Sequence, residues 1–396
     1  MAKVVVIGGG YAGISALREL SKRGDLEIVL IDKHSYHNLQ PEVYGYIANK
    51  IDAADMTIDL ITFCKGLGKN VKFYNNRVID IDFTNRVVNT EEGNVFPYDY
   101  VIIAVGARTF FPKQLEGLDR TDDLKKLHKA LSFKQRFELE IFKKIDNEGR
   151  ACEEFDIVIV GAGLSGVEIA AEMAYYASYI FKKGLFACNH MSIYLISATP
   201  TILPGMDPYL IEKSEKRLKE LNVKIITGKH MSSADKDFVY LSDGSKLRHS
   251  FILFAGGIEA SNLTNRLEIE KNKKGQIITD EFGRALGRVH VFACGDVMEG
   301  RDTDGNFAPA TVQIALQTGK CAAKNVINSI DKKPLEKYKC KNPGVMIALG
   351  GRYAAGMIGK SIKISGFLAF IAKSIIFFKY RKPLQMISKK GYHSLN

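Results

Sequence analysis

Paired cysteines at the spacings of zinc sites or redox-active dithiols are absent from the sequence. The chain has six cysteines in 396 residues, and no two of them stand in a C-x-x-C or C-x-x-x-x-C arrangement. Its eight histidines form no H-x-x-x-H pair. The sequence therefore predicts no metal site, and the scattered cysteines favour reduced thiols in a cytosolic protein.

Long hydrophobic runs are also missing. The apolar stretch from Gly366 to Phe378 is 13 residues long and is interrupted by Lys373, whereas a membrane-spanning helix needs about 20 apolar residues. No signal-peptide pattern precedes the first predicted strand, which begins by Lys3. We therefore expect that this stretch does not span a membrane and that the chain carries no export signal.

Acidic residues are scarce at the C-terminal end. Residues 331–396 hold 14 lysines and arginines against two acids, and 14 − 2 = +12 equals the net charge of the whole chain. Aromatic and aliphatic side chains bordered by such bases are typical of a helix that lies in a membrane surface. We predict adhesion to anionic lipids and no nucleic-acid binding, because the aliphatic content favours lipid. A core helix or a dimer-packing helix is the alternative.

A strand, a glycine-rich turn and a helix open the chain. Gly8, Gly10 and Gly13 form G-x-G-x-x-G after a run of β-branched residues, and a second predicted strand ends at Asp32. The first glycine permits a tight turn, the second lets a pyrophosphate approach, and the third lets the helix pack on the strand. An acid at the end of the second strand can accept hydrogen bonds from a ribose. This order of features predicts a dinucleotide site.

The same turn recurs in the middle of the chain. Gly161, Gly163 and Gly166 repeat the spacing, but the following strand ends at Ser197, where an acid would be expected. No lysine or arginine follows within residues 198–204 to hold a 2′-phosphate. We predict binding of a nicotinamide dinucleotide, with the choice between NADH and NADPH left open. A retained fold that no longer binds a cofactor is the alternative.

Two dinucleotide units in one chain predict an α/β protein with two Rossmann-like domains. One unit can hold a flavin dinucleotide and the other can admit a nicotinamide dinucleotide. A nicotinamide can transfer a hydride to a flavin, and the flavin can then release electrons to another acceptor. This transfer couples the two dinucleotides chemically.

Further segments resemble the two-dinucleotide flavoprotein superfamily. Residues 98–107 are similar to the strand before its crossover, where Gly106 approaches the flavin. Residues 287–297 are similar to its late flavin motif, in which Asp296 bonds the ribityl chain. The resemblance implies an FAD-binding domain interrupted by an inserted NAD(P)H-binding domain, followed by a basic region for membrane anchoring and dimerisation. The implied boundaries are 1–112 with 270–330 for FAD, 113–269 for NAD(P)H, and 331–396 for the basic region.

Within that superfamily the chain most resembles the type II NADH:quinone oxidoreductases. Residues 32–49, 251–263 and 308–320 are similar to that family's segments in the same order. Gln313 and Gln317 match its A-Q-x-x-x-Q helix at the quinone face of the flavin, with Val312 in place of the first alanine. Being four apart, the two glutamines share one helix face.

Glu168 follows the second glycine turn, and we expect it in the first turn of the next helix. An acid there commonly only stabilises the helix dipole. In the family that the chain resembles, this residue lies near the nicotinamide and is suspected in handling protons for the quinone. We therefore count Glu168, Gln313 and Gln317 as candidate catalytic residues.

The resemblance implies an enzyme that passes electrons from NADH through FAD to a membrane quinone. It further implies a homodimer. Because quinones dissolve in the bilayer and no targeting sequence is present, we expect a peripheral protein on the cytoplasmic face of the cell membrane. A sulfide:quinone oxidoreductase on the same scaffold is the first alternative, because Cys340 lies near a position where such enzymes use a cysteine. A flavin-binding redox sensor or scaffold is the second. A disulfide reductase is disfavoured, because the necessary cysteine pair is absent.

Overall fold

Most of the chain is described by a computed structural model. The described residues are 1–112, 114–146, 155–182, 191–301, 305, 307, 310–339, 341, 344–359 and 361–394.

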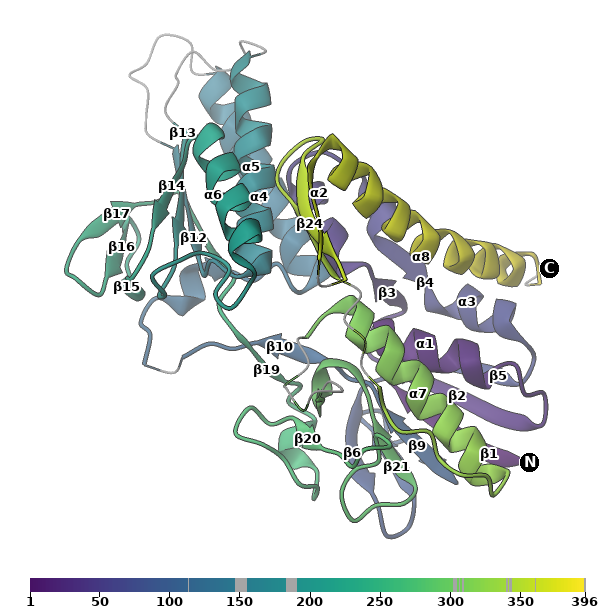
Figure 1. The fold of residues 1–396 in the computed structure, drawn as a ribbon. Helices are drawn as coiled ribbons and strands as arrows, with labels where there is room; N and C mark the ends of the chain where they lie inside the picture. Colours follow the sequence, from purple (N-terminus) through teal and green to yellow (C-terminus); the bar gives the residue numbers. More distant parts are fainter. Residues whose placement is uncertain are drawn as a thin grey trace.

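A five-stranded parallel sheet forms the core of the first unit, in the order β21-β9-β1-β2-β5. Val4–Ile7 on its central strand are buried, as expected when helices or other layers cover both faces of a parallel sheet. Helices α1 and α7 pack side by side against this sheet (Figure 1). The bounds are β1 (Ala2–Ile7), β2 (Leu26–Asp32), β5 (Val71–Asn75), β9 (Tyr100–Ile103), β21 (Val291–Ala293), α1 (Tyr11–Leu20), α3 (Leu60–Leu67) and α7 (Val312–Ile330).

A second parallel sheet has the order β11-β18-β12-β13-β14. Its strands all lie between β9 and β21 in the sequence, so the last strand of the first sheet follows the whole second sheet. The aromatic rings of Phe133 and Phe137 pack helix α4 against Phe251. The bounds are β11 (Thr121–Asp122), β12 (Phe155–Val160), β13 (Met191–Ile196), β14 (Val223–Ile226), β18 (Phe251–Phe254), α4 (Leu127–Asp146), α5 (Leu164–Lys182) and α6 (Pro208–Glu220). Two parallel Rossmann-like sheets confirm the predicted α/β class.

The chain crosses between the two sheets along β10 (Ala107–Thr109) and β19 (Ile258–Ala260), which pair antiparallel. Figure 1 shows these strands side by side between the units. The smaller strands are β3 (Tyr36–Asn38), β4 (Thr57–Asp59), β6 (Val78–Asp82), β7 (Val87–Thr90), β8 (Val95–Pro97), β15 (Met231–Ala234), β16 (Phe238–Leu241), β17 (Lys246–Arg248), β20 (Ile277–Ile278) and β22 (Met298–Glu299). The short helices are α2 (Val43–Ile47), η1 (Gln40–Glu42), η2 (Ala53–Met56), η3 (Leu118–Arg120), η4 (Thr264–Arg266) and η5 (Gly295–Val297).

The C-terminal region adds a three-stranded antiparallel sheet and one long helix. The strands are β23 (Gly344–Ala348), β24 (Ala354–Ile358) and β25 (Ile362–Gly366), and the helix is α8 (Phe367–His393). The helix is longer than the apolar stretch in the sequence and continues through Pro383. In the described part of the chain, none of the helices combines the length and the apolar character that crossing a membrane requires.

Helix α8 is held against α3 by a contact of two glycines. A Cβ atom on Gly391 would lie 1.7 Å from the carbonyl oxygen of Thr62, and one on Gly66 would lie 1.9 Å from that of Ile387. The hydroxyls of Thr62 and Ser388 lie 2.5 Å apart beside this contact. The helices can approach so closely only because both positions lack a side chain.

We predict that Gly391→Ala destabilises the protein, although alanine favours a helix over glycine. The new methyl group meets backbone atoms that cannot rotate away, and overpacking of this kind costs about 1–3 kcal/mol. The midpoint of thermal unfolding followed by circular dichroism measures the change. Gly24→Ala is the matched control, since nothing lies within 4 Å of an added Cβ there. Equal midpoints for the two variants would contradict the packing argument.

Candidate active site

The first glycine turn is shaped by two close backbone approaches. Gly8 has φ +103°, and a Cβ there would lie 2.5 Å from the carbonyl oxygen of Ala104. A Cβ on Gly13 would lie 1.8 Å from the oxygen of Gly8. At Gly10 nothing lies within 4 Å of an added Cβ. The turn therefore needs glycine at its ends, and at its centre it leaves open space beside the N-terminus of α1, where a phosphate is favoured.

The second glycine turn repeats this geometry in the other sheet. Gly161 has φ +108°, and its added Cβ would lie 2.7 Å from the oxygen of Ala255. A Cβ on Gly166 would lie 1.8 Å from the oxygen of Gly161, and Gly163 faces open space. Both turns are thus built for a phosphate at the start of a helix.

Asp32 ends β2 next to the first turn. Its Oδ2 accepts a hydrogen bond from the backbone N–H of Gly9 at 2.6 Å, and its Oδ1 accepts one from His34 at 2.7 Å. Burial raises the pKa of the Asp32 carboxyl, and these two hydrogen bonds act in the opposite direction. Each oxygen keeps a further lone pair, so the group can still accept from a ribose.

Ser197 stands at the corresponding place in the second sheet and is buried. Its hydroxyl donates to the carbonyl oxygen of Thr201 at 2.9 Å and lies 2.9 Å from the hydroxyl of Thr199. The hydrogen of this hydroxyl is therefore used within its own loop, and no carboxylate marks the end of β13.

The other expected flavin contacts lie at the same edge of the first sheet. Gly106 follows β9 and Asp296 follows β21, and both strands run parallel to β1, so their carboxyl ends meet beside the first turn. Burial raises the pKa of the Asp296 carboxyl, and the ammonium group of Lys125 opposes this effect. Thr318 of α7 accepts a hydrogen bond from Gly295 N–H at 2.9 Å and so ties this segment to the helix. An open phosphate turn with partly buried acids at one sheet edge fits an adenine dinucleotide.

Glu168 is the fifth residue of α5, in its second turn, so our expectation of the first turn was wrong. The helix begins already at Leu164, before the last glycine of the turn. The side chain is 7% exposed. Its Oε1 accepts a hydrogen bond from Ala348 N–H at 2.8 Å and forms an ion pair with Lys373 of α8. Glu168 therefore joins α5 to the C-terminal region.

The two glutamines of α7 have different surroundings. Both polar atoms of the Gln317 amide bond the backbone of Lys341, at 2.8 and 2.9 Å, so this side chain anchors the following segment. Gln313 lines a cavity of about 440 Å³, and its buried Oε1 has no hydrogen-bond partner among the described residues. The rest of the lining is apolar and includes Met346, Met357, Ala372, Ile375 and Ile376. Of the two, only Gln313 lines this cavity, and its Oε1 is buried without a partner among the described residues.

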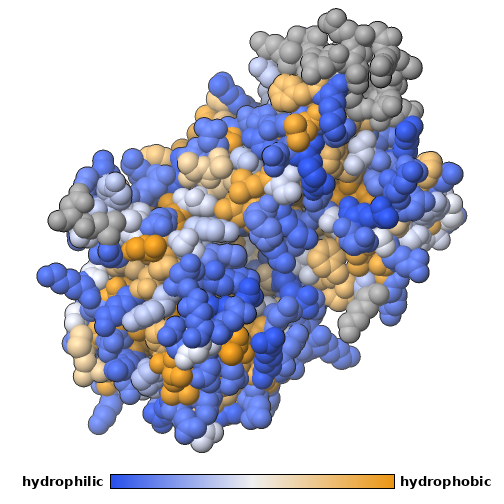
Figure 2. Space-filling model, turned by 180° about the vertical axis from the view of Figure 1, so that it is seen from behind, coloured by the Kyte–Doolittle hydropathy of each residue, from blue (hydrophilic) through white to orange (hydrophobic). Residues whose placement is uncertain are grey.

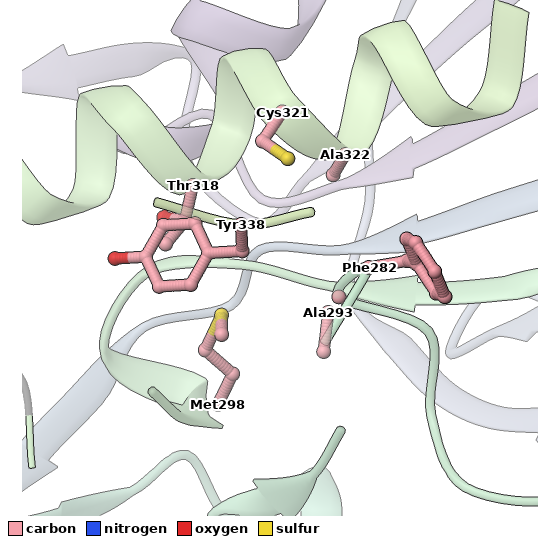
Figure 3. Close-up of a pocket in the computed structure, with 8 residues that line it drawn as sticks. Phe282, Ala293, Met298, Thr318, Cys321, Ala322 and Tyr338 are labelled. Atoms are coloured by element: carbon pink, nitrogen blue, oxygen red, sulfur yellow. The ribbon is translucent and has the colours of Figure 1, made fainter. Parts of the chain in front are cut away.

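A second hollow lies between α7 and β21 (Figure 3). Thr318, Cys321, Met298 and Tyr338 surround it, and it has room for about 10 Å³, which is close to one water molecule. Burial raises the pKa of the Cys321 thiol to about 11, so it is protonated at neutral pH. The hollow is too small for a substrate.

Apolar side chains are exposed along the first half of α8. The exposed residues are Phe367, Leu368, Ile371, Ile375, Ile376 and Phe378. Phe370 of the same stretch is only partly exposed, and the ammonium group of Lys50 lies 5.3 Å from its ring centre. The face seen from behind in Figure 2 carries apolar residues as separate patches among hydrophilic ones. The first half of α8 thus presents a row of large apolar groups to its surroundings.

Two curated proteins with similar sequences carry the same name. The type II NADH:quinone oxidoreductase of Haemophilus influenzae is 26% identical over 395 residues, which cover 90% of this chain and 87% of that protein. The Staphylococcus aureus protein of the same name is 26% identical, with 94% of each chain covered.

Solved structures share the fold. NDH2 from Plasmodium falciparum in complex with NADH has a TM-score of 0.86 at 17% identity, with 99% of this chain and 97% of that chain covered. The sulfide:quinone oxidoreductase of Aquifex aeolicus has a TM-score of 0.82 at 19% identity, with 98% and 92% covered. The family model described as pyridine nucleotide-disulphide oxidoreductase matches residues 2–319. This chain therefore belongs to the pyridine nucleotide-disulphide oxidoreductase family.

Proposed function

We propose that this chain is an NADH:quinone oxidoreductase that uses FAD. The observation that carries this function is the presence of two glycine turns of the same geometry, each at the edge of its own parallel sheet. Two dinucleotides can therefore be held by one chain. The relatives named type II NADH:quinone oxidoreductase are similar over nine-tenths of its length, which supports the same reaction.

The division of the chain follows from where it crosses between the sheets. Residues 1–112 and 270–330 form the FAD domain, 113–269 the inserted NAD(H) domain, and 331–396 the region for membrane contact and dimerisation. In support, β10 and β19 lie side by side, and β21 returns to the first sheet after the second is complete.

FAD is held by the first turn and the acids beside it. Gly8, Gly10 and Gly13 admit the pyrophosphate, Asp32 accepts from the ribose, and Gly106 and Asp296 meet the flavin end. When bound, FAD supplies a ring that accepts hydride and delivers electrons to a second substrate. Gly161, Gly163 and Gly166 hold the pyrophosphate of NADH at the N-terminus of α5.

The quinone occupies the 440 Å³ cavity beside Gln313. Its apolar lining suits a lipid-soluble ring, and the amide N–H of Gln313 can donate a hydrogen bond to a quinone oxygen. Gln317 contributes indirectly, by fixing the segment at Lys341. Reduction of a quinone by NADH consumes one proton besides the hydride, and water or Glu168, which pairs with Lys373, supplies it.

Contact with the membrane gives the enzyme access to its quinone. The exposed apolar row of α8 enters the lipid surface, and the exposed Lys379 and Lys382 meet anionic headgroups. The protein is thus peripheral, on the cytoplasmic face of the cell membrane, and a homodimer through its C-terminal region.

Sulfide as the electron donor is the second candidate, favoured by the Aquifex aeolicus structure. At 19% identity that likeness concerns the fold alone. Cys340, on which this alternative depends, lies outside the described residues. A sensor or scaffold that binds flavin without turnover is the third reading. The donor experiment below separates these readings.

We predict that Gly13→Ala weakens the binding of FAD, whereas Gly166→Ala weakens the binding of NADH. Each new methyl group would lie 1.8 Å from a carbonyl oxygen and would push one helix off its turn. Purified Gly13→Ala protein should lose most of its visible flavin absorbance. Gly166→Ala protein should stay yellow and be bleached by dithionite, but not by NADH, under anaerobic conditions.

The wild type should be bleached by NADH. Bleaching by sulfide instead would favour the sulfide reading, and bleaching by none of NADH, NADPH and sulfide would favour the sensor. Normal bleaching of Gly166→Ala by NADH would contradict the assignment of the second turn.

We predict that Gln313→Leu raises the KM for quinone by about 2–10-fold, which corresponds to one lost hydrogen bond of about 0.5–1.5 kcal/mol. Steady-state assays with a short-chain quinone measure the change. The rate with a water-soluble one-electron acceptor should not change. Gln385→Leu on α8, outside the cavity lining, is the control. An unchanged KM would remove Gln313 from the quinone site.

We predict that the double variant Leu368→Glu and Phe378→Glu binds anionic vesicles at least tenfold more weakly. Burying each such side chain in an apolar medium contributes about 1.5–3 kcal/mol, which a carboxylate loses. Co-sedimentation with vesicles measures binding. Phe142→Glu on α4 is the control, because Phe142 is similarly exposed but far along the chain from the basic region. If the double variant pellets like the control, α8 is not the anchor.

A further inference from the structure

Helix α2 belongs to the first unit by sequence but packs in the core of the second. In the chain it lies between β2 and β5, which are neighbouring strands of the first sheet. Its side chains Val43, Tyr44 and Ile47 are buried in one hydrophobic cluster with residues of α4, α5 and β12. Helices α4 and α5 pack on α2 (Figure 1). The segment that carries α2 therefore connects the two units directly.

Polar contacts fix this segment to the second unit on both sides of α2. Before the helix, Gln40 Nε2 donates a hydrogen bond to the carbonyl oxygen of Leu124 at 3.0 Å. After the helix, the ammonium group of Lys50 pairs with the carboxylate of Glu172 on α5 at 2.9 Å. Helix α2 is thus held at both ends against the second unit.

One contact from α2 reaches the second glycine turn itself. The hydroxyl of Tyr44 donates a hydrogen bond to the hydroxyl of Ser165 at 2.8 Å. Ser165 lies between Gly163 and Gly166 and is the second residue of α5. The Tyr44 side chain is 8% exposed, and burial raises the pKa of its hydroxyl to about 12, so the hydroxyl keeps its proton at neutral pH. The turn that we assign to NADH is therefore hydrogen-bonded to a residue of the first unit.

Hydride transfer depends on the distance between the two bound dinucleotides. In this step the hydride leaves C4 of the nicotinamide with both electrons of its C–H bond and goes to N5 of the flavin, so NADH is oxidised to NAD+ and FAD is reduced. The reacting atoms must approach to about 3–3.5 Å, and a misplacement of about 1 Å can lower the rate about 100-fold. A side chain that fixes the second turn relative to the FAD domain can therefore affect this step without touching either cofactor.

We propose that Tyr44 is a positioning residue for hydride transfer, and that it fixes the NADH turn relative to the FAD domain through its hydrogen bond to Ser165. Strand β2, which ends at Asp32 beside the FAD turn, leads into the segment of α2, so a short length of chain joins the two dinucleotide sites. Tyr44 acts through Ser165 and does not itself touch the nucleotide. This inference rests on the proposed function.

The test compares Tyr44→Phe with the wild type in anaerobic stopped-flow measurements of flavin bleaching by NADH. Phenylalanine keeps the buried ring and removes only the hydroxyl. The limiting rate at saturating NADH should fall about tenfold, because the turn is no longer held in place for the reaction. The NADH concentration that gives half of this rate should change by less than about twofold. The matched control is Tyr46→Phe, in the same helix, where the ring lies 4.2 Å from the ammonium group of Lys134, and it should behave like the wild type.

A double-variant cycle isolates the hydrogen bond. Ser165→Ala should lower the limiting rate as Tyr44→Phe does. The double variant should be no slower than either single variant, because both changes remove the same contact. Ser165→Thr keeps a hydroxyl and should restore most of the rate. If the effects of Tyr44→Phe and Ser165→Ala multiply instead, the contact between the two hydroxyls does not position the turn.

A further measurement does not depend on turnover. Hydrogen exchange of the backbone amides is followed by mass spectrometry in FAD-loaded protein without NADH. Tyr44→Phe should speed exchange in peptides that contain the second glycine turn and leave peptides of the first turn unchanged. Wild-type exchange at the second turn of this variant would contradict the proposal.

A wild-type limiting rate in Tyr44→Phe would overturn the positioning role. An unchanged limiting rate with a raised half-maximal NADH concentration would also overturn it, because the hydroxyl would then serve nucleotide binding. If the wild type itself is not bleached by NADH, the proposed function fails. If the wild type and Tyr44→Phe are bleached equally fast, only the inference about Tyr44 fails.

Discussion

The approach of one peptide group to another inside each glycine turn is the constraint on which both dinucleotide sites depend. A side chain at Gly13 or Gly166 would stand 1.8 Å from a carbonyl oxygen, so the helix can start against the strand only if the residue is glycine. In the first sheet, the unpaired N–H groups at the start of α1 then face the edge at which Asp32 and Asp296 also lie. The phosphate site is therefore a result of backbone packing, to which side chains only add selectivity.

Features that depend on neighbouring residues could be predicted from the sequence. The first turn, its two strands and Asp32 all lie within residues 2–32, and the glycine spacing is nearly sufficient to specify them. The position of Glu168 was predicted less well, because the start of α5 depends on packing and not on a capping residue. Its partner Lys373 could not be predicted, since 205 residues separate the two and no pattern connects them.

The two glutamines show the same limit within one helix. Their spacing indicates a shared face, yet Gln317 bonds a backbone segment 24 residues later while Gln313 opens into a cavity. Their surroundings differ because of the path that the chain takes after α7, and the local periodicity of the sequence does not predict this path. Ser197 is a similar case. The sequence shows that an acid is missing at this position, but it does not show that the Ser197 hydroxyl donates to the carbonyl oxygen of Thr201.

The structure shows a contact of Lys373 that the sequence pattern does not predict. In the sequence it interrupts an apolar stretch already too short to cross a membrane. In the structure its ammonium group turns away from the exposed apolar row and pairs with Glu168. Removing either partner would leave a charge poorly solvated, which is far more costly than losing an exposed pair. The same residue thus joins α8 to α5 and directly follows Ala372 of the cavity wall, so this one contact contributes both to the attachment of α8 and to the position of that wall.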